Sequence, residues 1–216
     1  MRLLYLHGFR SSPQSGKAMA VHWHVLAHNA AVPKNQRTMW YCPQLPPSPK
    51  QAMAQIMRWV HAGGAAQPLA VIGSSLGGYY AAQVAELAGC RCVLLNPAVF
   101  PARDLKAFIG RVQNWHNEGG YAFTQRHIDE LQAMQSTAFT QPSRYMAIIS
   151  KGDEVLDWRE MTARYPAKHM RLLTGSDHAI SEFDGFANEV LQFVLSARAE
   201  CLHSQAPVKS INDHSF

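Results

Sequence analysis

A serine flanked by glycines is the first feature of this sequence that could do chemistry. Residues 73–77 read GSSLG and fit the pattern G-x-S-x-G, in which Ser75 is the central residue and Ser74 takes the variable position. The glycines permit a turn so sharp that the central side chain stands clear of the backbone. The pattern also arises by chance, and alone it fits a serine that merely caps a helix. A nucleophile at Ser75 therefore needs support from the rest of the chain.

A serine hydroxyl attacks a carbonyl carbon only with a base beside it, so a histidine and a carboxylate are required. Among the 11 histidines, His178 lies between the last strand-like run and the last amphipathic segment. Open α/β sheets carry reactive groups in such loops, at the carboxyl ends of parallel strands. His24 and His28 have i,i+4 spacing, but no H-E-x-x-H pattern or nearby carboxylate accompanies them. His178 is therefore the predicted base, and no metal site is expected.

The acid is expected after the penultimate strand-like run, where the sequence reads KGDEVLD. Asp153 is the first carboxylate past that run, and the chain order Ser, acid, His is the one this architecture uses. Asp157 fits better as the N-cap of the next helix, but it and Glu154 remain alternatives. Asp177 is a weaker candidate because its side chain and that of the adjacent His178 diverge. Asp153 is thus the predicted partner of the histidine.

The turn LHGF near the N-terminus could help to stabilise a negatively charged intermediate. Gly8 allows the chain to turn tightly, so that the backbone N–H of Phe9 could face the same point as the N–H of Leu76. Two N–H groups aimed at one point form an oxyanion hole beside Ser75. His7 lies in the same turn, and its ring is expected to be either structural or directed toward the substrate.

Six apolar runs of strand length alternate with segments of helical character. The expected strands cover residues 3–9, 39–46, 69–74, 92–99, 144–153 and 169–175. The expected helices cover residues 15–29, 48–62, 76–88, 157–164 and 184–197, and the second is expected to begin with Ser48 as its N-cap and Pro49 as its first helical residue. This alternation predicts an α/β fold with a mainly parallel sheet of about six strands and helices on both faces. The residues of the first helix expected to face the core are Met19, His22 or Trp23, and Leu26.

Composition and charge limit the possible partners. The 216 residues carry a formal net charge of +5, but Arg and Lys are scattered, so no nucleic-acid partner is expected. No apolar segment approaches the roughly 20 residues that span a membrane, and MRLLYLHGF is typical of a strand rather than a signal peptide. Without C-x-x-C pairs, the cysteines are expected to be reduced thiols in a cytoplasmic protein. One domain is expected over residues 1–197, with a flexible tail over 198–216.

These segments resemble the α/β-hydrolase superfamily and, more closely, the YqiA-like small bacterial esterases. The resemblance is carried by LLYLHGFRSSP, GSSLGGYYA, LLNPAV, GDEVLD and GSDHAI and extends to about residue 194. It implies that Ser75, His178 and Asp153 are nucleophile, base and acid, and that the two amides named above form the oxyanion hole. It also implies activity on carboxylic esters, with acyl thioesters such as acyl-CoA as a narrower alternative.

Residues 100–144 lie where such enzymes insert a cap over the pocket. This segment contains no strand-like run but has helical pieces around 102–109 and 125–135, so a small helical cap is expected. Its aromatic side chains could line an acyl site or could pack the cap onto the sheet. They are Phe108, Trp115, Tyr121, Phe123 and Phe139. Phe108 and Trp115, together with His7, are the candidate substrate-binding residues.

The combined pattern predicts a serine hydrolase that cleaves small-molecule esters or thioesters through an acyl-enzyme, without a cofactor. Two alternatives stay open because a fold does not fix a function and the triad serves several reactions. One is a non-catalytic protein that binds acyl ligands. The other is a hydrolase of another bond, such as an amide or a carbon–carbon bond. The sequence leaves the oligomeric state and the physiological substrate undetermined.

Overall fold

The centre of the molecule is a sheet of six parallel strands in the order β2-β1-β3-β4-β7-β8. The computed structural model describes residues 1–63, 67–113, 120–134 and 138–197. The strands of the sheet are β1 (Arg2–Leu6), β2 (Met39–Tyr41), β3 (Leu69–Ser74), β4 (Arg91–Leu95), β7 (Tyr145–Ser150) and β8 (His169–Leu173). The predicted parallel sheet is confirmed. Its strands are mostly shorter than expected because several apolar runs continue into the loops that follow them.

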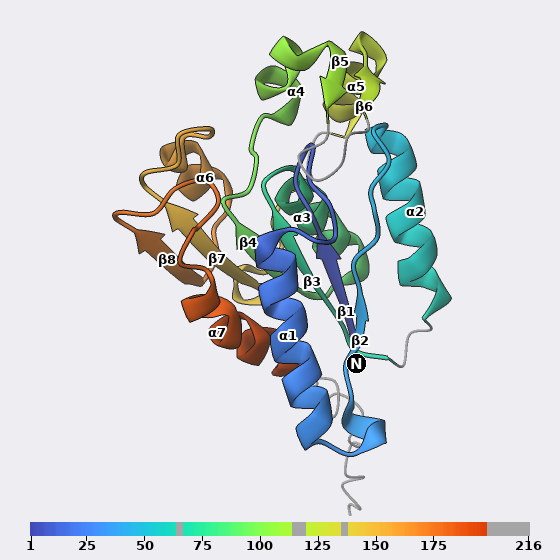
Figure 1. Ribbon diagram of the computed structural model, residues 1–216, viewed down its shortest axis with the longest axis vertical. Helices are drawn as coiled ribbons and strands as arrows, with labels where there is room; N and C mark the ends of the chain where they lie inside the picture. Colours follow the sequence, from blue (N-terminus) through green and yellow to red (C-terminus); the bar gives the residue numbers. More distant parts are fainter. Residues whose placement is uncertain (64–66, 114–119, 135–137, 198–216) are drawn as a thin grey trace, which may run out of the picture.

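Helices cover both faces of this sheet (Figure 1). The helices α1 (Gly16–Ala31) and α7 (Asp184–Leu195) pack on one face, and α2 (Pro49–Ala62), α3 (Leu76–Ala88) and α6 (Trp158–Arg164) pack on the other. Alternate side chains of each strand enter the two cores, because successive residues of a strand point to opposite faces. Among the described helices, none is both long enough and apolar enough to cross a membrane.

The start of α2 follows the predicted capping pattern. The Ser48 hydroxyl accepts a hydrogen bond from the Gln51 N–H at 3.2 Å, and Pro49 is the first helical residue. A serine cap satisfies an N–H that has no partner within the helix, and proline at this position has no N–H to leave unpaired. The prediction of this helix start is confirmed.

The prediction of which residues of α1 face the core was wrong for Leu26 and for Trp23, whereas Met19 and His22 are half-buried. The buried residues of this helix are Ala18, Val21 and Val25, whereas Trp23 and Leu26 are 62% and 44% exposed. Small and β-branched side chains on the inner side let α1 lie close to the sheet and to α7. The larger apolar side chains are therefore displaced toward solvent.

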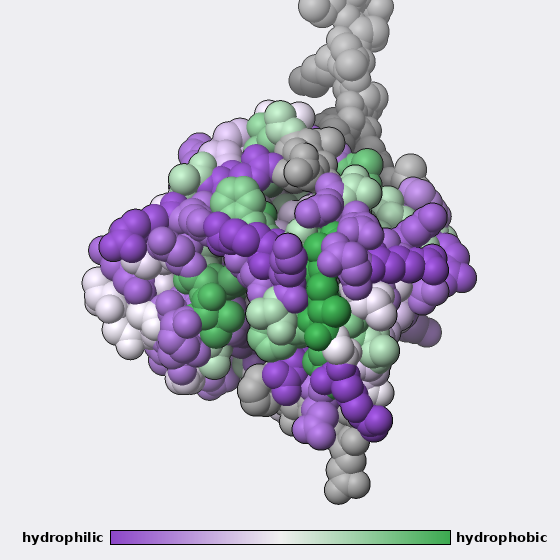
Figure 2. All heavy atoms as spheres, turned by 90° about the horizontal axis from the view of Figure 1, so that it is seen from above, coloured by the Kyte–Doolittle hydropathy of each residue, from purple (hydrophilic) through white to green (hydrophobic). Residues whose placement is uncertain are grey.

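The described parts of residues 100–144 lie above the carboxyl ends of the central strands (Figure 1). The expectation of a purely helical cap is corrected here, because an antiparallel pair, β5 (Gly110–Gln113) and β6 (Gly120–Phe123), lies between α4 (Pro101–Asp104) and α5 (Gln125–Ala133). Within the two described strands, Val112 and Phe123 are the buried residues, so the sequence of these strands contains no apolar run that would predict them. Seen from this end, the surface carries apolar patches separated by polar side chains (Figure 2).

Candidate active site

Ser75 lies at a sharp turn between β3 and α3. Its φ of 55° and ψ of −122° are unusual for a residue with a side chain. The backbone is held there by four hydrogen bonds. The Ser75 N–H donates to the Leu95 carbonyl at 3.0 Å, and the Ser75 carbonyl accepts from the N–H groups of Gly78, Tyr79 and Ala98 at 2.9, 3.3 and 3.0 Å. Surrounding structure that fixes a strained residue in this way is typical of functional sites.

Two glycines allow the chain to approach this turn closely. A Cβ atom at Gly77 would collide with the backbone carbonyl of Leu6, at the end of β1. A Cβ atom at Gly8 would lie 3.1 Å from the Ser75 Cβ and 3.6 Å from its Oγ. The turn that follows β1 therefore lies against the hydroxyl of Ser75 because neither glycine carries a side chain.

His178 pairs with Asp153 in the loops that follow β8 and β7. The His178 Nδ1 and the Asp153 Oδ2 are 2.7 Å apart, and the Asp153 side chain is fully buried. The other carboxylate oxygen accepts hydrogen bonds from the N–H groups of Val155 and Leu156, both at 2.8 Å. A carboxylate facing Nδ1 holds the ring proton on that nitrogen and leaves Nε2 able to accept a proton.

The other candidate carboxylates make different contacts. Asp157 caps α6 by accepting a hydrogen bond from the Arg159 N–H at 2.8 Å. Glu154 accepts the backbone N–H of His178 at 3.0 Å and does not contact its ring. Asp177 accepts hydrogen bonds from the N–H and hydroxyl of Ser181. Of the four carboxylates considered from the sequence, Asp153 is the one that contacts the imidazole.

Ser75 and His178 line the same groove, whose volume is about 670 Å³. Among the described residues, no hydrogen bond joins the Ser75 Oγ to His178, and such bonds often tighten only when substrate binds. The predicted oxyanion donors, the N–H groups of Phe9 and Leu76, donate to no other described residue. Both N–H groups thus keep their hydrogen-bonding capacity for a ligand.

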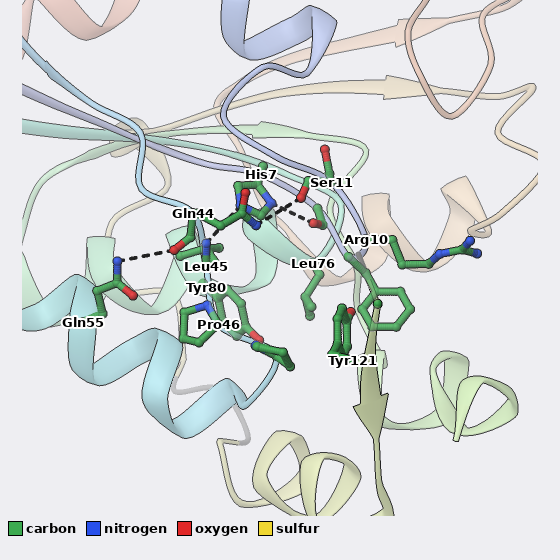
Figure 3. Close-up of a pocket in the computed structure, with 14 residues that line it drawn as sticks. His7, Arg10, Ser11, Gln44, Leu45, Pro46, Gln55, Leu76, Tyr80 and Tyr121 are labelled. Carbon is green, nitrogen blue, oxygen red and sulfur yellow. Dashed lines mark hydrogen bonds between the residues drawn. The ribbon is translucent and has the colours of Figure 1, made fainter. Parts of the chain in front are cut away.

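The ring of His7 connects two loops. Its Nδ1 donates to the Gly8 carbonyl at 2.9 Å, and its Nε2 accepts the Leu45 N–H at 3.1 Å (Figure 3). Because Nε2 accepts a hydrogen bond, the ring is neutral and Nδ1 carries the proton. Of the two roles left open for His7, these contacts favour the structural one.

The aromatic residues proposed for the cap take several positions. Phe108 is 41% exposed and packs edge-on against Phe9, with ring centroids 5.4 Å apart. Phe123 is buried and also packs on Phe9. Phe139 packs instead on Tyr145 and Tyr165, away from the Phe9 ring. Trp115 lies outside the described residues, as does the tail over 198–216.

A pocket of about 360 Å³ adjoins Phe9 and Leu76 on the side of the cap (Figure 3). Its walls come from the turn after β1, the loop between β2 and α2, α2 itself through Gln55, the first turns of α3, and β6. The rings of Tyr80 and Tyr121 and the side chains of Leu45 and Pro46 line it. We call it the cap-side pocket.

Asn96, at the end of β4, is a buried residue that the sequence analysis overlooked. Its amide nitrogen donates to the carbonyls of Asp177 and His178, both at 3.1 Å, and its amide oxygen accepts the Ser150 N–H at 2.8 Å. Its φ of 42° is one that asparagine tolerates better than most residues. The signal in the sequence that could have identified Asn96 was its position as a polar residue at the end of an apolar run.

Lys17, in the first turn of α1, also holds the histidine loop and was also overlooked. Its ammonium group donates to the carbonyls of His178 and Ala179 at 3.1 and 2.7 Å. Ile180 follows with a φ of 51°, which is strained for a β-branched residue. Nothing in the sequence around Lys17 indicates a partner 161 residues away.

Comparisons with known proteins identify the family and the fold of this chain. The model of a family described as "Uncharacterised protein family (UPF0227)" matches residues 2–195. Among solved structures, Est1E from Butyrivibrio proteoclasticus with bound ferulic acid is similar, with a TM-score of 0.65 and 14% identity over 92% of this chain and 89% of that one. Mouse alpha/beta hydrolase domain-containing protein 10 gives a TM-score of 0.65 and 12% identity over 88% and 89% of the two chains. The esterase domain of a Rhodothermus marinus protein gives 0.61 and 19% over 91% and 86%. The chain therefore has the α/β-hydrolase fold.

Proposed function

We propose that this chain, which belongs to the uncharacterised protein family UPF0227, is a serine hydrolase that cleaves carboxylic esters through an acyl-enzyme. The observation that carries the proposal is the 2.7 Å contact between Asp153 and His178, in a loop that shares a groove with Ser75. The strained turn at Ser75 adds support, because such strain is common where a nucleophile is held ready.

In the first half of the reaction, His178 takes the proton of Ser75 as the Oγ attacks the ester carbonyl carbon. Asp153 keeps the ring in the required tautomer and stabilises the imidazolium that forms. The negative charge that develops on the carbonyl oxygen is met by the N–H groups of Phe9 and Leu76. In related sites, the loss of one such donor costs on the order of a hundredfold or more in rate.

The first half ends when His178 delivers its proton to the departing alcohol, the carbon–oxygen bond breaks, and the acyl group remains on Ser75. In the second half, a water molecule gives its proton to His178 and attacks the acyl carbon. The bond between that carbon and the Ser75 Oγ then breaks, His178 returns the proton to the Oγ, and the acid is released. His178 therefore acts as a base and then as an acid in each half.

The acyl group is proposed to enter the cap-side pocket. Its volume of about 360 Å³ suits an acyl chain of limited length, which Leu45, Pro46, Tyr80 and Tyr121 would contact. Arg10, Gln44 and Gln55 add polar side chains to the lining. An acyl thioester presents the same carbonyl to Ser75, so ester and thioester substrates are both included in the proposal.

Labelling with a fluorophosphonate tests the nucleophile. The probe is expected to modify the purified protein on Ser75, and Ser75→Ala should abolish labelling and ester hydrolysis. Ser74→Ala is the matched control, because Ser74 is the neighbouring serine and lies at the end of β3. Labelling that persists in Ser75→Ala would overturn the assignment.

A substrate panel then defines the reaction. Butyryl esters, thioesters and amides with the same acyl group should be compared by their kcat/KM values. The proposal expects ester or thioester turnover with a covalent butyryl adduct on Ser75 detectable by mass spectrometry. Tight binding of these compounds without turnover or adduct would instead identify a non-catalytic binding protein.

A further inference from the structure

A groove on the other side of the nucleophile runs between α1 and the histidine loop. It has a volume of about 670 Å³, nearly twice that of the cap-side pocket. Its described lining comes from the turn after β1, the end of β3 with Ser75, the first half of α1, and residues 178–184, with no contribution from segment 100–144. We call it the α1 groove.

Trp23 forms the wall of the α1 groove farther along the helix. Its side chain is 62% exposed and lines the groove, so the indole is accessible to a ligand there. Its ring stacks on His22, with centroids 6.5 Å apart and planes 21° from parallel, and His22 stacks in turn on Trp40 at 5.2 Å. The indole thus extends this row of rings to the groove, where a flat ligand can stack on it.

The groove is polar near the reacting atoms and more apolar farther away. Lys17 lies beside His178 and gives two of its three N–H groups to backbone carbonyls, so one remains for a ligand atom. Met19, Trp23 and Phe183 continue the lining along α1 and at the start of α7. A flat apolar group with an oxygen at one end matches this distribution.

The role of His178 decides which part of an ester enters the groove. The imidazole must deliver its proton to the oxygen that leaves, so that oxygen has to lie on the His178 side of the reacting carbon. His178 lines the α1 groove and is absent from the lining of the cap-side pocket. The alcohol part of the ester is thereby assigned to the α1 groove, and the acyl part to the cap-side pocket.

We infer that the α1 groove binds the leaving group of the substrate and that Trp23 selects esters of flat, aromatic alcohols. This inference rests on the proposed ester hydrolysis and extends it to the substrate class. As the bond from the Ser75 Oγ to the acyl carbon forms, the bond to the alcohol oxygen breaks. The proton taken from Ser75 passes through His178 to that oxygen, and the aromatic alcohol departs along α1.

The test compares two esters that differ only in the alcohol. Ethyl butyrate and 2-naphthylmethyl butyrate have the same acyl group. Both release a primary alcohol, and only the second alcohol carries an aromatic ring. In Trp23→Ala, the ratio of kcat/KM for the naphthylmethyl ester to that for the ethyl ester is expected to fall about tenfold, mainly through KM, because a buried aromatic contact is lost. Leu87→Ala, which truncates an exposed apolar residue of α3 outside the groove lining, should leave the ratio unchanged.

Two results would overturn the inference. One is an unchanged ratio in Trp23→Ala, which includes an equal loss on both esters, and the other is a loss that follows acyl length between ethyl butyrate and ethyl octanoate. A wrong assignment of the groove can be distinguished from a wrong proposal of ester hydrolysis. The rate at which a small fluorophosphonate labels Ser75 makes the distinction. If wild type is labelled and hydrolyses ethyl butyrate but the ratio does not move, only the assignment of the groove is wrong. If wild type is neither labelled nor active, ester hydrolysis itself is wrong.

Discussion

The two carboxylates Asp153 and Asp157 are four residues apart and have unrelated tasks. Asp153 is fully buried, accepts two backbone N–H groups and contacts His178. Asp157 is largely exposed and accepts one N–H group at the start of α6. A carboxylate that is enclosed and bonded on both oxygens has one fixed orientation, and that is what a partner of a catalytic histidine requires.

Asp153→Asn is expected to lower kcat for ester hydrolysis by about 10³–10⁴-fold with little change in KM. The amide oxygen can still accept the two N–H groups, but the amide NH₂ would then face His178 Nδ1 and force the proton onto Nε2. The histidine would lose its ability to act as a base. Steady-state kinetics with an activated butyryl ester provides the measurement.

Asp157→Asn is the matched control, because it makes the same chemical change four residues away. Asparagine caps helices about as well as aspartate, so kcat and the free energy of unfolding should both stay close to wild type. A similar loss of kcat in the two variants would show that the effect is structural. If Asp153→Asn kept the kcat of wild type, Asp153 would have no part in the mechanism.

Lys17 makes stability depend on pH. Burial lowers the pKa of Lys17 to about 8, against the opposing effect of Asp153, Asp177 and Glu154, whereas an unperturbed lysine has a pKa of 10.5. Between these values the unfolded chain binds more protons than the folded one, so this contribution to the free energy of unfolding rises with pH. The stability of wild type relative to Lys17→Met should therefore increase by about 1–3 kcal/mol from pH 8 to pH 10. Urea unfolding at pH 7.5, 9 and 10 measures it, and a pH-independent difference would contradict it.

At the scale of elements, the end of β4 connects the catalytic loops. Asn96 joins the end of β7 through the Ser150 N–H and holds the loop after β8 through two carbonyls. These hydrogen bonds of Asn96 bring the loops of Asp153 and His178 together, although the two residues are 25 positions apart in the chain. Buried polar networks of this kind position their members only while every group is satisfied.

Asn96→Asp is expected to lower the free energy of unfolding at pH 7 by about 2–4 kcal/mol and to reduce kcat with it. A buried carboxylate would face the carbonyl oxygens of Asp177 and His178 without a proton to donate. Its folded-state pKa would therefore rise above the unfolded value, so the stability deficit should shrink as the pH falls toward 5. Urea unfolding at pH 5, 6 and 7 is the measurement.

Ser150→Ala is the control for this network. It removes only the 3.3 Å contact between the Ser150 hydroxyl and the amide nitrogen of Asn96, and it keeps both bonds to the histidine loop. The loss of stability should be about 1 kcal/mol or less and independent of pH between 5 and 7. A pH-independent deficit in Asn96→Asp would contradict the proposed origin of its effect.

At the scale of the whole molecule, the cap is attached to the sheet domain through α2 and α3. Glu130, on α5, accepts hydrogen bonds from the Ser48 hydroxyl at 2.6 Å and the Lys50 N–H at 3.2 Å. The Tyr79 hydroxyl and the Gln83 amide donate to the carbonyl of Met134, just after α5. These contacts fix the position of the cap and, with it, one wall of the cap-side pocket.

Glu130→Gln is expected to weaken the attachment of the cap by about 1 kcal/mol and to accelerate proteolytic cleavage within residues 100–144. Burial raises the pKa of Glu130, but the hydrogen bonds from Ser48, Lys50 and Arg126 outweigh this and lower it overall. The carboxylate therefore contributes stability above its unfolded pKa, and the difference from Glu130→Gln should vanish as the pH falls through the folded value.

Asp129→Asn tests whether this effect is specific. Asp129 is the adjacent carboxylate and is bonded within α5, by the Gln125 amide at 2.8 Å. Limited proteolysis of Asp129→Asn should match wild type at pH 7. Equal acceleration in both variants would mean that the charge of α5, rather than its bond to α2, holds the cap.

The sequence by itself determined the alternation of strands and helices and the residues at the strand ends. Apolar runs and glycine turns are local signals, so the six strands, the capped start of α2 and the turn at Ser75 could be predicted from neighbouring residues alone. The buried side of α1 and the β5–β6 hairpin could not. The first depends on how closely α7 and the sheet approach α1, and the hairpin has too few buried side chains to leave a pattern.

Only the tertiary structure decided how the strand ends meet. The order β3-β4-β7-β8 places Ser75, Asn96, Asp153 and His178 on successive strand ends, whereas the sequence gives only their positions along the chain. Lys17 and Asn96 gain their roles from partners 161 and 82 residues away, and no local spacing encodes such contacts. Trp23 likewise became the wall of a groove because packing of smaller residues turned it outward. The types of the reacting groups follow from local sequence, but their mutual geometry follows from the packing of distant segments.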